Sequence, residues 1–141
     1  MKQDTRMAAT TEYDSRYLQG VLRFNRAEYF EAHEVWEDLW HDTAGPERRF
    51  IQGLIQAAVC VYHANNGNAM GSRRLFHSGR RYMAGFPNRH LGLDAEYFWK
   101  MMERALADLL ADSSVTFATL RADCVPKIAL LPEPGCWPED S

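Results

Sequence analysis

The sequence has no apolar run long enough to cross a membrane. None of its stretches approaches the roughly 18 consecutive apolar residues of a transmembrane helix, and the polar start MKQDTRMAATTEYD lacks the apolar core of a signal peptide. We therefore expect a cytoplasmic protein that does not bind membranes.

Cysteine is scarce, and there is no surplus of positive charge. The three cysteines, Cys60, Cys124 and Cys136, are odd in number and share no CxxC spacing, which argues against a disulfide framework. Sixteen basic and 19 acidic side chains give a formal net charge of -3, whereas general nucleic-acid binders are basic. Glycine-rich phosphate loops are also missing. We therefore expect no nucleic-acid partner.

Strand patterns are almost absent, and helical periodicity takes their place. Apolar side chains recur three and four residues apart in five segments. These segments span residues 15–25, 27–41, 46–65, 69–84 and 95–111. The sequence therefore predicts an all-α fold, a bundle of about five helices.

The two ends of the chain differ in composition from the helical part. Residues 1–13 are mostly polar, which predicts a flexible N-terminus. Four of the six prolines follow residue 112, and proline excludes a long helix, so we expect residues 113–141 to form an extended, proline-rich C-terminal arm. Between them, residues 14–112 form the predicted helical domain, because a chain that is 46% hydrophobic can fill one core.

The run HEVWEDLWH, residues 33–41, places three unusual side chains on one helix face. At about 100° per residue, spacings of four and three keep His33, Glu37 and Trp40 within roughly a sixth of a turn of one another. Phe30 falls on the same stripe, so we expect this face to look into the protein, where a charge needs a partner. The stripe is the best candidate for chemistry in the chain.

The third predicted helix has a polar stripe of its own. Its stretch FIQGLIQAAVCVY is apolar on nearly every side, which predicts burial, yet Gln52, Gln56 and His63 lie within about 40° of one another. If the preceding turn folds the two helices into an antiparallel pair, Glu37 lies near Gln52 and His33 near Gln56. We therefore expect Glu37 within hydrogen-bond reach of His33 or of one of these amides.

Two functions compete for this cluster. The first is a binding or structural module in which the motif lines a small internal pocket, with Trp40, Gln52, Gln56 and His63 as binding residues. The alternative is an enzyme that uses His33 and Glu37 as an acid–base pair, with metal-assisted hydrolysis as one form of it. No nucleophile, oxyanion donor or cofactor motif accompanies the pair. The sequence leaves open whether a small molecule or a second copy of the chain is a partner.

No metal site and no cofactor are predicted. The HExxH pattern of zinc peptidases is absent, because the fifth residue of the run is Glu37. Nor does a Glu-x-x-His pair repeat on two helices, as di-iron bundles require. The stripe offers one imidazole and one carboxylate, whereas a catalytic zinc ion has three protein ligands.

The motif also resembles that of a known family. HEVWEDLW fits the HxxxExxW signature of the bacterial and archaeal family called domain of unknown function 309, and the resemblance covers about residues 22–84. Further blocks of the sequence are similar to it: the lead-in FNRAEYFEA, GLIQ at 53–56, GN at 67–68, Gly71, and RL at 74–75. The resemblance implies a small all-helical fold and a motif of suspected importance, without an established activity.

Overall fold

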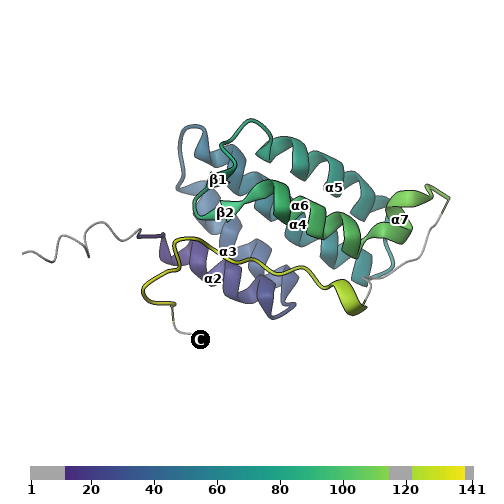
Figure 1. Ribbon diagram of the computed structural model, residues 1–141, viewed down its shortest axis with the longest axis horizontal. Helices are drawn as coiled ribbons and strands as arrows, with labels where there is room; N and C mark the ends of the chain where they lie inside the picture. Colours follow the sequence, from purple (N-terminus) through teal and green to yellow (C-terminus); the bar gives the residue numbers. More distant parts are fainter. Residues whose placement is uncertain (1–11, 115–121, 139–141) are drawn as a thin grey trace, which may run out of the picture.

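The structure, a computed structural model, describes residues 12–114 and 122–138, and most of them are helical (Figure 1). The described α-helices are α2 (Ser15–Asn25), α3 (Tyr29–His41), α4 (Glu47–Asn65), α5 (Ala69–Met83), α6 (Ala95–Ala105) and α7 (Ala107–Ala111). The prediction of an all-α bundle is confirmed. Among the described residues, no helix combines the length and the apolar composition that crossing a bilayer requires.

Side-chain caps explain where three of these helices begin. Asp14, Asn68 and Asp94 each accept a hydrogen bond from a backbone N–H in the first turn of the helix that follows, which satisfies a donor that the helix itself leaves free. The turn between α4 and α5 contains Gly67 with a φ of +79°, a left-handed conformation that glycine adopts without steric cost. These local signals are readable in the sequence, and the observed helix bounds lie close to the predicted ones.

The predicted helix over residues 95–111 is two helices. The regular pattern ends at Leu106, whose φ of -110° and ψ of 22° separate α6 from α7. Leu106 and Leu109 are both buried, so the break still lets both side chains reach the core. The helix break depends on how Leu106 and Leu109 pack in the tertiary structure, so periodicity alone does not predict it.

A short hairpin between α5 and α6 was not expected from the sequence. β1 (Arg89–His90) pairs antiparallel with β2 (Leu93–Asp94). The two residues between the strands both have positive φ, with Leu91 at 51° and Gly92 at 78°, as in the tight turns of two-residue hairpins. The hairpin brings His90 back toward the start of α4.

Helices α2, α3, α4 and α5 pack in sequence order, each against the next. Helices α4 and α5 approach closely at two glycines: a Cβ atom on Gly53 would lie 3.0 Å from the Gly79 carbonyl oxygen, and one on Gly79 would lie 3.3 Å from that of Gly53. In Figure 1, α6 and the yellow C-terminal segment lie nearer the viewer than α3 and α4. The core lies between these two groups, and α4 contributes more buried residues to it than any other described helix.

The described C-terminal residues contact the helices of the same chain. After the short 3₁₀ helix η1 (Ala122–Cys124) the segment is extended, and Asn25 bonds to both backbone groups of Ile128: its amide nitrogen donates to the carbonyl at 2.9 Å and its oxygen accepts from the N–H at 2.7 Å. Ile128 and Leu130 are buried. Most of the predicted flexible N-terminus, and residues 115–121 and 139–141 of the predicted arm, lie outside the described residues.

Candidate functional site

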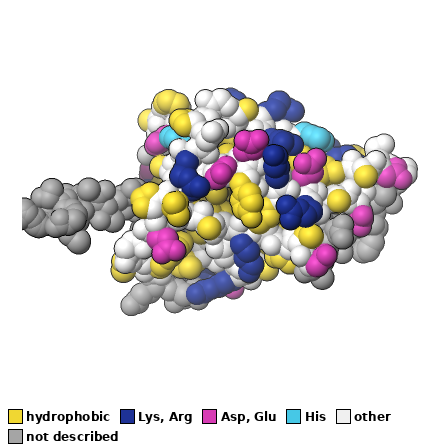
Figure 2. Space-filling view, in the orientation of Figure 1, with side chains coloured by type: hydrophobic (Ala, Val, Ile, Leu, Met, Phe, Trp, Pro, Cys, Tyr) yellow, Lys and Arg dark blue, Asp and Glu magenta, His cyan; other side chains and the backbone are white. Residues whose placement is uncertain are grey.

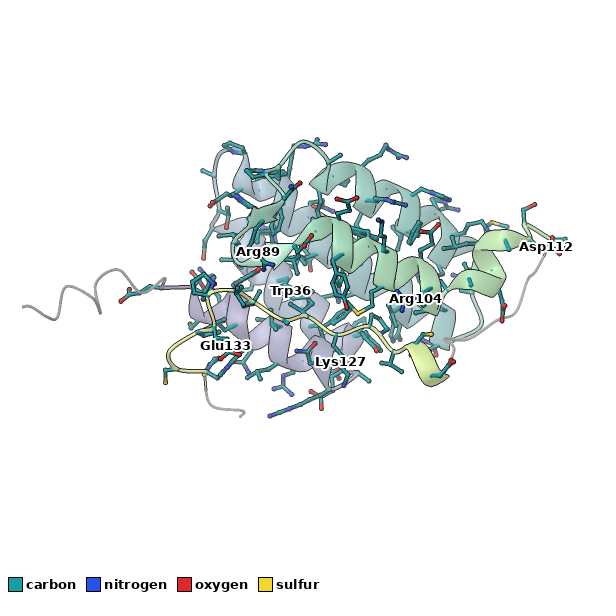
Figure 3. The ribbon with its side chains drawn as sticks, viewed as in Figure 1. Trp36, Arg89, Arg104, Asp112, Lys127 and Glu133 are labelled. Carbon is teal, nitrogen blue, oxygen red and sulfur yellow. The ribbon has the colours of Figure 1, made fainter. Side chains whose placement is uncertain are left out.

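The inner face of α3 is apolar and belongs to the core. Its buried side chains are Tyr29, Ala32, Trp36 and Leu39. Trp36, labelled in Figure 3, is fully buried, and its indole N–H donates to the Tyr17 carbonyl at 3.1 Å. In the HEVWEDLW segment, Trp36 therefore belongs to the buried face that packs in the core.

The motif stripe is offset from this core stripe by one residue, which is about 100° around the helix. The Glu37 side chain is 54% exposed, while His33 is 18% exposed, and Phe30 is 42% exposed. The expectation that this face looks into the protein is therefore wrong for Glu37 and Phe30. Trp36 fits the core instead, because a large apolar ring gains most from burial.

The His33 ring donates a hydrogen bond to a backbone carbonyl, and makes none to Glu37. Its Nδ1 lies 2.8 Å from the Phe30 carbonyl oxygen, and since a carbonyl only accepts, Nδ1 carries the proton. Nε2 lies 4.0 Å from Oε1 of Glu37, which is beyond a hydrogen bond. The predicted His33–Glu37 hydrogen bond is absent, and Glu37 remains available to solvent and to partners.

The polar stripe of α4 does not join the motif. Gln56 turns toward α5, where its side-chain oxygen accepts a hydrogen bond from the Ser78 hydroxyl. Gln52 is half-buried, and within residues 12–114 no hydrogen bond links it to His33 or Glu37. The predicted cluster of five side chains is therefore wrong, because α4 is rotated so that Gln56 faces α5.

Two other motif predictions have different outcomes. The Arg48 guanidinium lies 3.6 Å from the ring centroid of Trp40, and these two residues are equally far from the turn, so the predicted antiparallel pairing of α3 and α4 is confirmed. His63 lies at the far end of α4, with Nδ1 3.5 Å from the side-chain nitrogen of Asn68. The Trp40 ring is thus covered by a cation, and His63 is set apart from His33.

The outer surface of α3 and α4 carries an aromatic patch, defined here as Phe30, His33 and Tyr62. The Phe30 ring centroid lies 4.9 Å from that of His33 and 5.2 Å from that of Tyr62, and Tyr62 is 37% exposed. Sequence reasoning missed Tyr62, although Phe30 was on the predicted stripe. The available signal was the antiparallel pairing itself, which places the end of α4 beside the start of α3.

The described residues offer no ready metal centre. In residues 12–114 and 122–138, no three His, Cys, Asp or Glu side chains gather closely enough to hold an ion. The metal content of the protein, and the acid–base alternative for His33 and Glu37, remain predictions.

A second candidate region, with an ionisable pair beside a cavity, lies where α4 begins and α5 ends. His90 packs against the rings of Phe50 and Phe86, each 4.8 Å away between centroids, and its Nε2 lies 3.4 Å from Oε2 of Glu47. This Nε2 is buried and makes no hydrogen bond within the described residues. His90 and Glu47 line a cavity of about 670 Å³. The hairpin brings them together, so no sequence pattern indicates the site.

Comparison with known proteins identifies the helical segment. The model of the family described as domain of unknown function (DUF309) matches residues 17–75. The resemblance stated from the sequence is confirmed. The matched segment holds most of α2, all of α3 and α4 and the first half of α5, and hence the whole aromatic patch.

A curated relative extends the similarity. The chain is 30% identical over 95 residues to "Uncharacterized protein YpuF" of Bacillus subtilis (strain 168), which covers 64% of this chain and 55% of the relative. The chain thus spans about half the length of the curated relative it matches.

Proposed function

We propose that this protein is a binding module and that the outer face of α3 and α4 docks a basic, amphipathic helix of a partner protein. The observation that carries the proposal is the exposure of Phe30 and Tyr62 beside glutamates that, within the described residues, pair with no lysine or arginine. Large aromatic side chains are enriched at protein interfaces, where they supply most of the buried apolar area. Phe30 and Tyr62 stay partly exposed side by side, and neighbouring exposed apolar side chains mark interaction surfaces.

The charge around the patch selects the partner. Helix α3 has no lysine or arginine in its 13 residues, and Glu31, Glu34 and Glu37 are all exposed. Within the described residues, none of these three carboxylates has a lysine or arginine as an ion-pair partner. Opposite charge steers association and suppresses wrong partners, so this face favours lysine or arginine in the segment that it binds.

The spacing on the face favours a helix. Phe30, Glu34 and Glu37 recur three and four residues apart along α3, and Tyr62 of α4 lies against Phe30. The 13 residues of α3 extend roughly 20 Å at 1.5 Å per residue. A partner helix of similar length can set apolar side chains against the aromatic patch and basic ones against the glutamates, which is the helix-in-groove mode of recognition.

The test uses two synthetic amphipathic peptides with the same leucine face, one with lysine and one with glutamate on its polar face. Fluorescence anisotropy at fixed ionic strength should show saturable binding of the lysine peptide only, and added salt should weaken it. Phe30→Ala and Glu37→Lys should each lower the affinity about tenfold or more, in line with interface hot spots. Tyr97→Ala, which removes an exposed ring on α6, is the matched control.

Two results would contradict the proposal. The first is equal binding of the lysine and glutamate peptides. The second is an effect of Tyr97→Ala as large as that of Phe30→Ala, because it would show general adhesion to exposed rings. Figure 2 shows hydrophobic side chains over the face formed by α6 and the C-terminal segment, so this control tests a real competing surface.

A further inference from the structure

A cavity of about 290 Å³ opens between α4 and α5, outside the motif face. It is lined by Arg49, Gln56, Ser78, Arg81 and Tyr82. Each of these side chains carries a hydrogen-bond donor, and none carries a negative charge. We propose that this cavity binds the phosphoryl group of a small phosphate monoester.

The positive charge in the cavity is not neutralised by the protein. Arg49 comes from α4 and Arg81 from α5, and in the part of the chain that the structure describes no carboxylate forms an ion pair with either. Arg49 lies over the Tyr82 ring, 4.9 Å from its centroid, which restrains its guanidinium group. Two guanidinium groups with planar donor geometry suit the oxygens of a phosphoryl group.

The neutral side chains complete the donor set. The Ser78 hydroxyl donates to the Gln56 side-chain oxygen, so the acceptor of this amide is occupied and its NH₂ group remains as the donor. Gln56 is half-buried, and its NH₂ group is the neutral donor that is left, because the Ser78 proton is already used. A cavity with two cations, a free amide donor and no carboxylate favours an anion over a cation.

The organic group of the ligand fits the adjoining cavity. Arg49 also lines the 670 Å³ cavity, where Pro46, Ala84 and Phe86 provide apolar walls. Glu47 lines the same cavity, and its carboxylate disfavours a second anionic group there. The site therefore fits one phosphoryl group joined to an uncharged, partly apolar organic group, and it does not fit a diphosphate.

Isothermal titration calorimetry with phenyl phosphate and with inorganic phosphate tests this site at matched ionic strength. Phenyl phosphate should bind saturably and more tightly than inorganic phosphate, because it also fills the apolar cavity. Arg81→Gln should weaken both ligands about tenfold or more, since it removes a charge-assisted contact. Arg74→Gln removes the same charge from the same helix outside the cavity, and should leave both affinities unchanged.

A second variant separates the contribution of the apolar group to affinity from that of the phosphoryl group. Ala84→Leu narrows the apolar cavity, so it should reduce the affinity for phenyl phosphate to that for inorganic phosphate and leave inorganic phosphate unaffected. Thermal melting of each variant checks that it is folded. Equal losses from Arg81→Gln and Arg74→Gln, no saturable binding of either phosphate, or equal binding of phenol and phenyl phosphate would each overturn the proposal. The peptide-docking test is independent, because it concerns other residues.

Discussion

The inner and outer faces of α3 both carry aromatic rings, yet the structure uses them differently. On the inner face Trp36 is fully buried and its only polar atom is bonded. On the outer face Phe30 is exposed, and Glu37 has no hydrogen bond to His33. A single residue of offset thus separates side chains that stabilise the fold from side chains that are available to a partner. The predictions below test that separation.

The largest effect is expected on the inner face. Trp36→Ala should lower the free energy of unfolding by about 3 to 5 kcal/mol, because it removes a large buried ring and leaves a cavity. Phe30→Ala, on the outer face of the same helix, should change stability far less. Urea unfolding followed by circular dichroism measures both. Equal losses would mean that the two faces of α3 do not differ in the way that their burial indicates.

A smaller loss is expected from crowding the same ring. A Cβ atom added at Gly20 would overlap the Trp36 indole, so Gly20→Ala should cost about 1 to 3 kcal/mol by overpacking. Gly135→Ala is the control, since an added Cβ there meets nothing within 4 Å. Thermal melting of both variants decides the matter. A Gly20→Ala protein as stable as the parent would show that Trp36 is loosely held.

The buried Cys60 thiol of α4 predicts that the protein loses stability at alkaline pH. Burial raises the pKa of the Cys60 thiol from 9.0 to about 12, and a hydrogen bond with Ser72 offsets only part of that rise. Above pH 9 the unfolded chain loses this proton and the folded protein keeps it. Stability should therefore fall as the pH rises from 9 toward 12, by up to about 1.4 kcal/mol per pH unit from this group.

Burial also raises the pKa of the Tyr17 and Tyr29 hydroxyls, so these groups add to the alkaline loss above pH 10. Cys60→Ala separates the contributions, because it should flatten the stability profile between pH 9 and 10 and keep the tyrosine part at higher pH. Urea unfolding at a series of pH values is the measurement. An unchanged slope between pH 9 and 10 in the variant would rule out the buried thiol as its source.

The smallest effect is expected at the motif carboxylate. Glu37→Gln should change the free energy of unfolding by less than about 0.5 kcal/mol, because exposed side chains without strong contacts contribute little. A buried network would have cost roughly 1 to 3 kcal/mol on losing this group. The same variant should lower the affinity for the lysine peptide, since it removes one negative charge from the outer face of α3. A large loss of stability would restore the network interpretation.

Helical periodicity was sufficient for most of the architecture. The caps Asp14, Asn68 and Asp94 and the left-handed Gly67 act over a few neighbouring residues, so their effects are visible in the chain itself. The hairpin at 89–94 and the break at Leu106 were missed, because both depend on contacts with distant elements.

The candidate site was harder to predict, because helix rotation depends on every neighbour at once. The stripe of His33, Glu37 and Trp40 was assigned correctly to one face, but Glu37 is exposed where burial was expected. Choosing between that stripe and the one through Trp36 requires the positions of α2 and α4. The same limit applies to Gln56, whose partner Ser78 lies on a helix that the motif argument did not include.

The sequence by itself determined that this chain is helical, where most of its helices begin, and that α3 and α4 pair across a short turn, since hydrogen bonding and capping act locally along the chain. Only the tertiary structure decided which face of α3 is buried, which side chains form the aromatic patch, and that Arg49 lines both the cavity with Arg81 and the cavity with Glu47 and His90. The physical reason is that burial is a collective property: each helix turns until the whole core is filled, and no single segment carries that information.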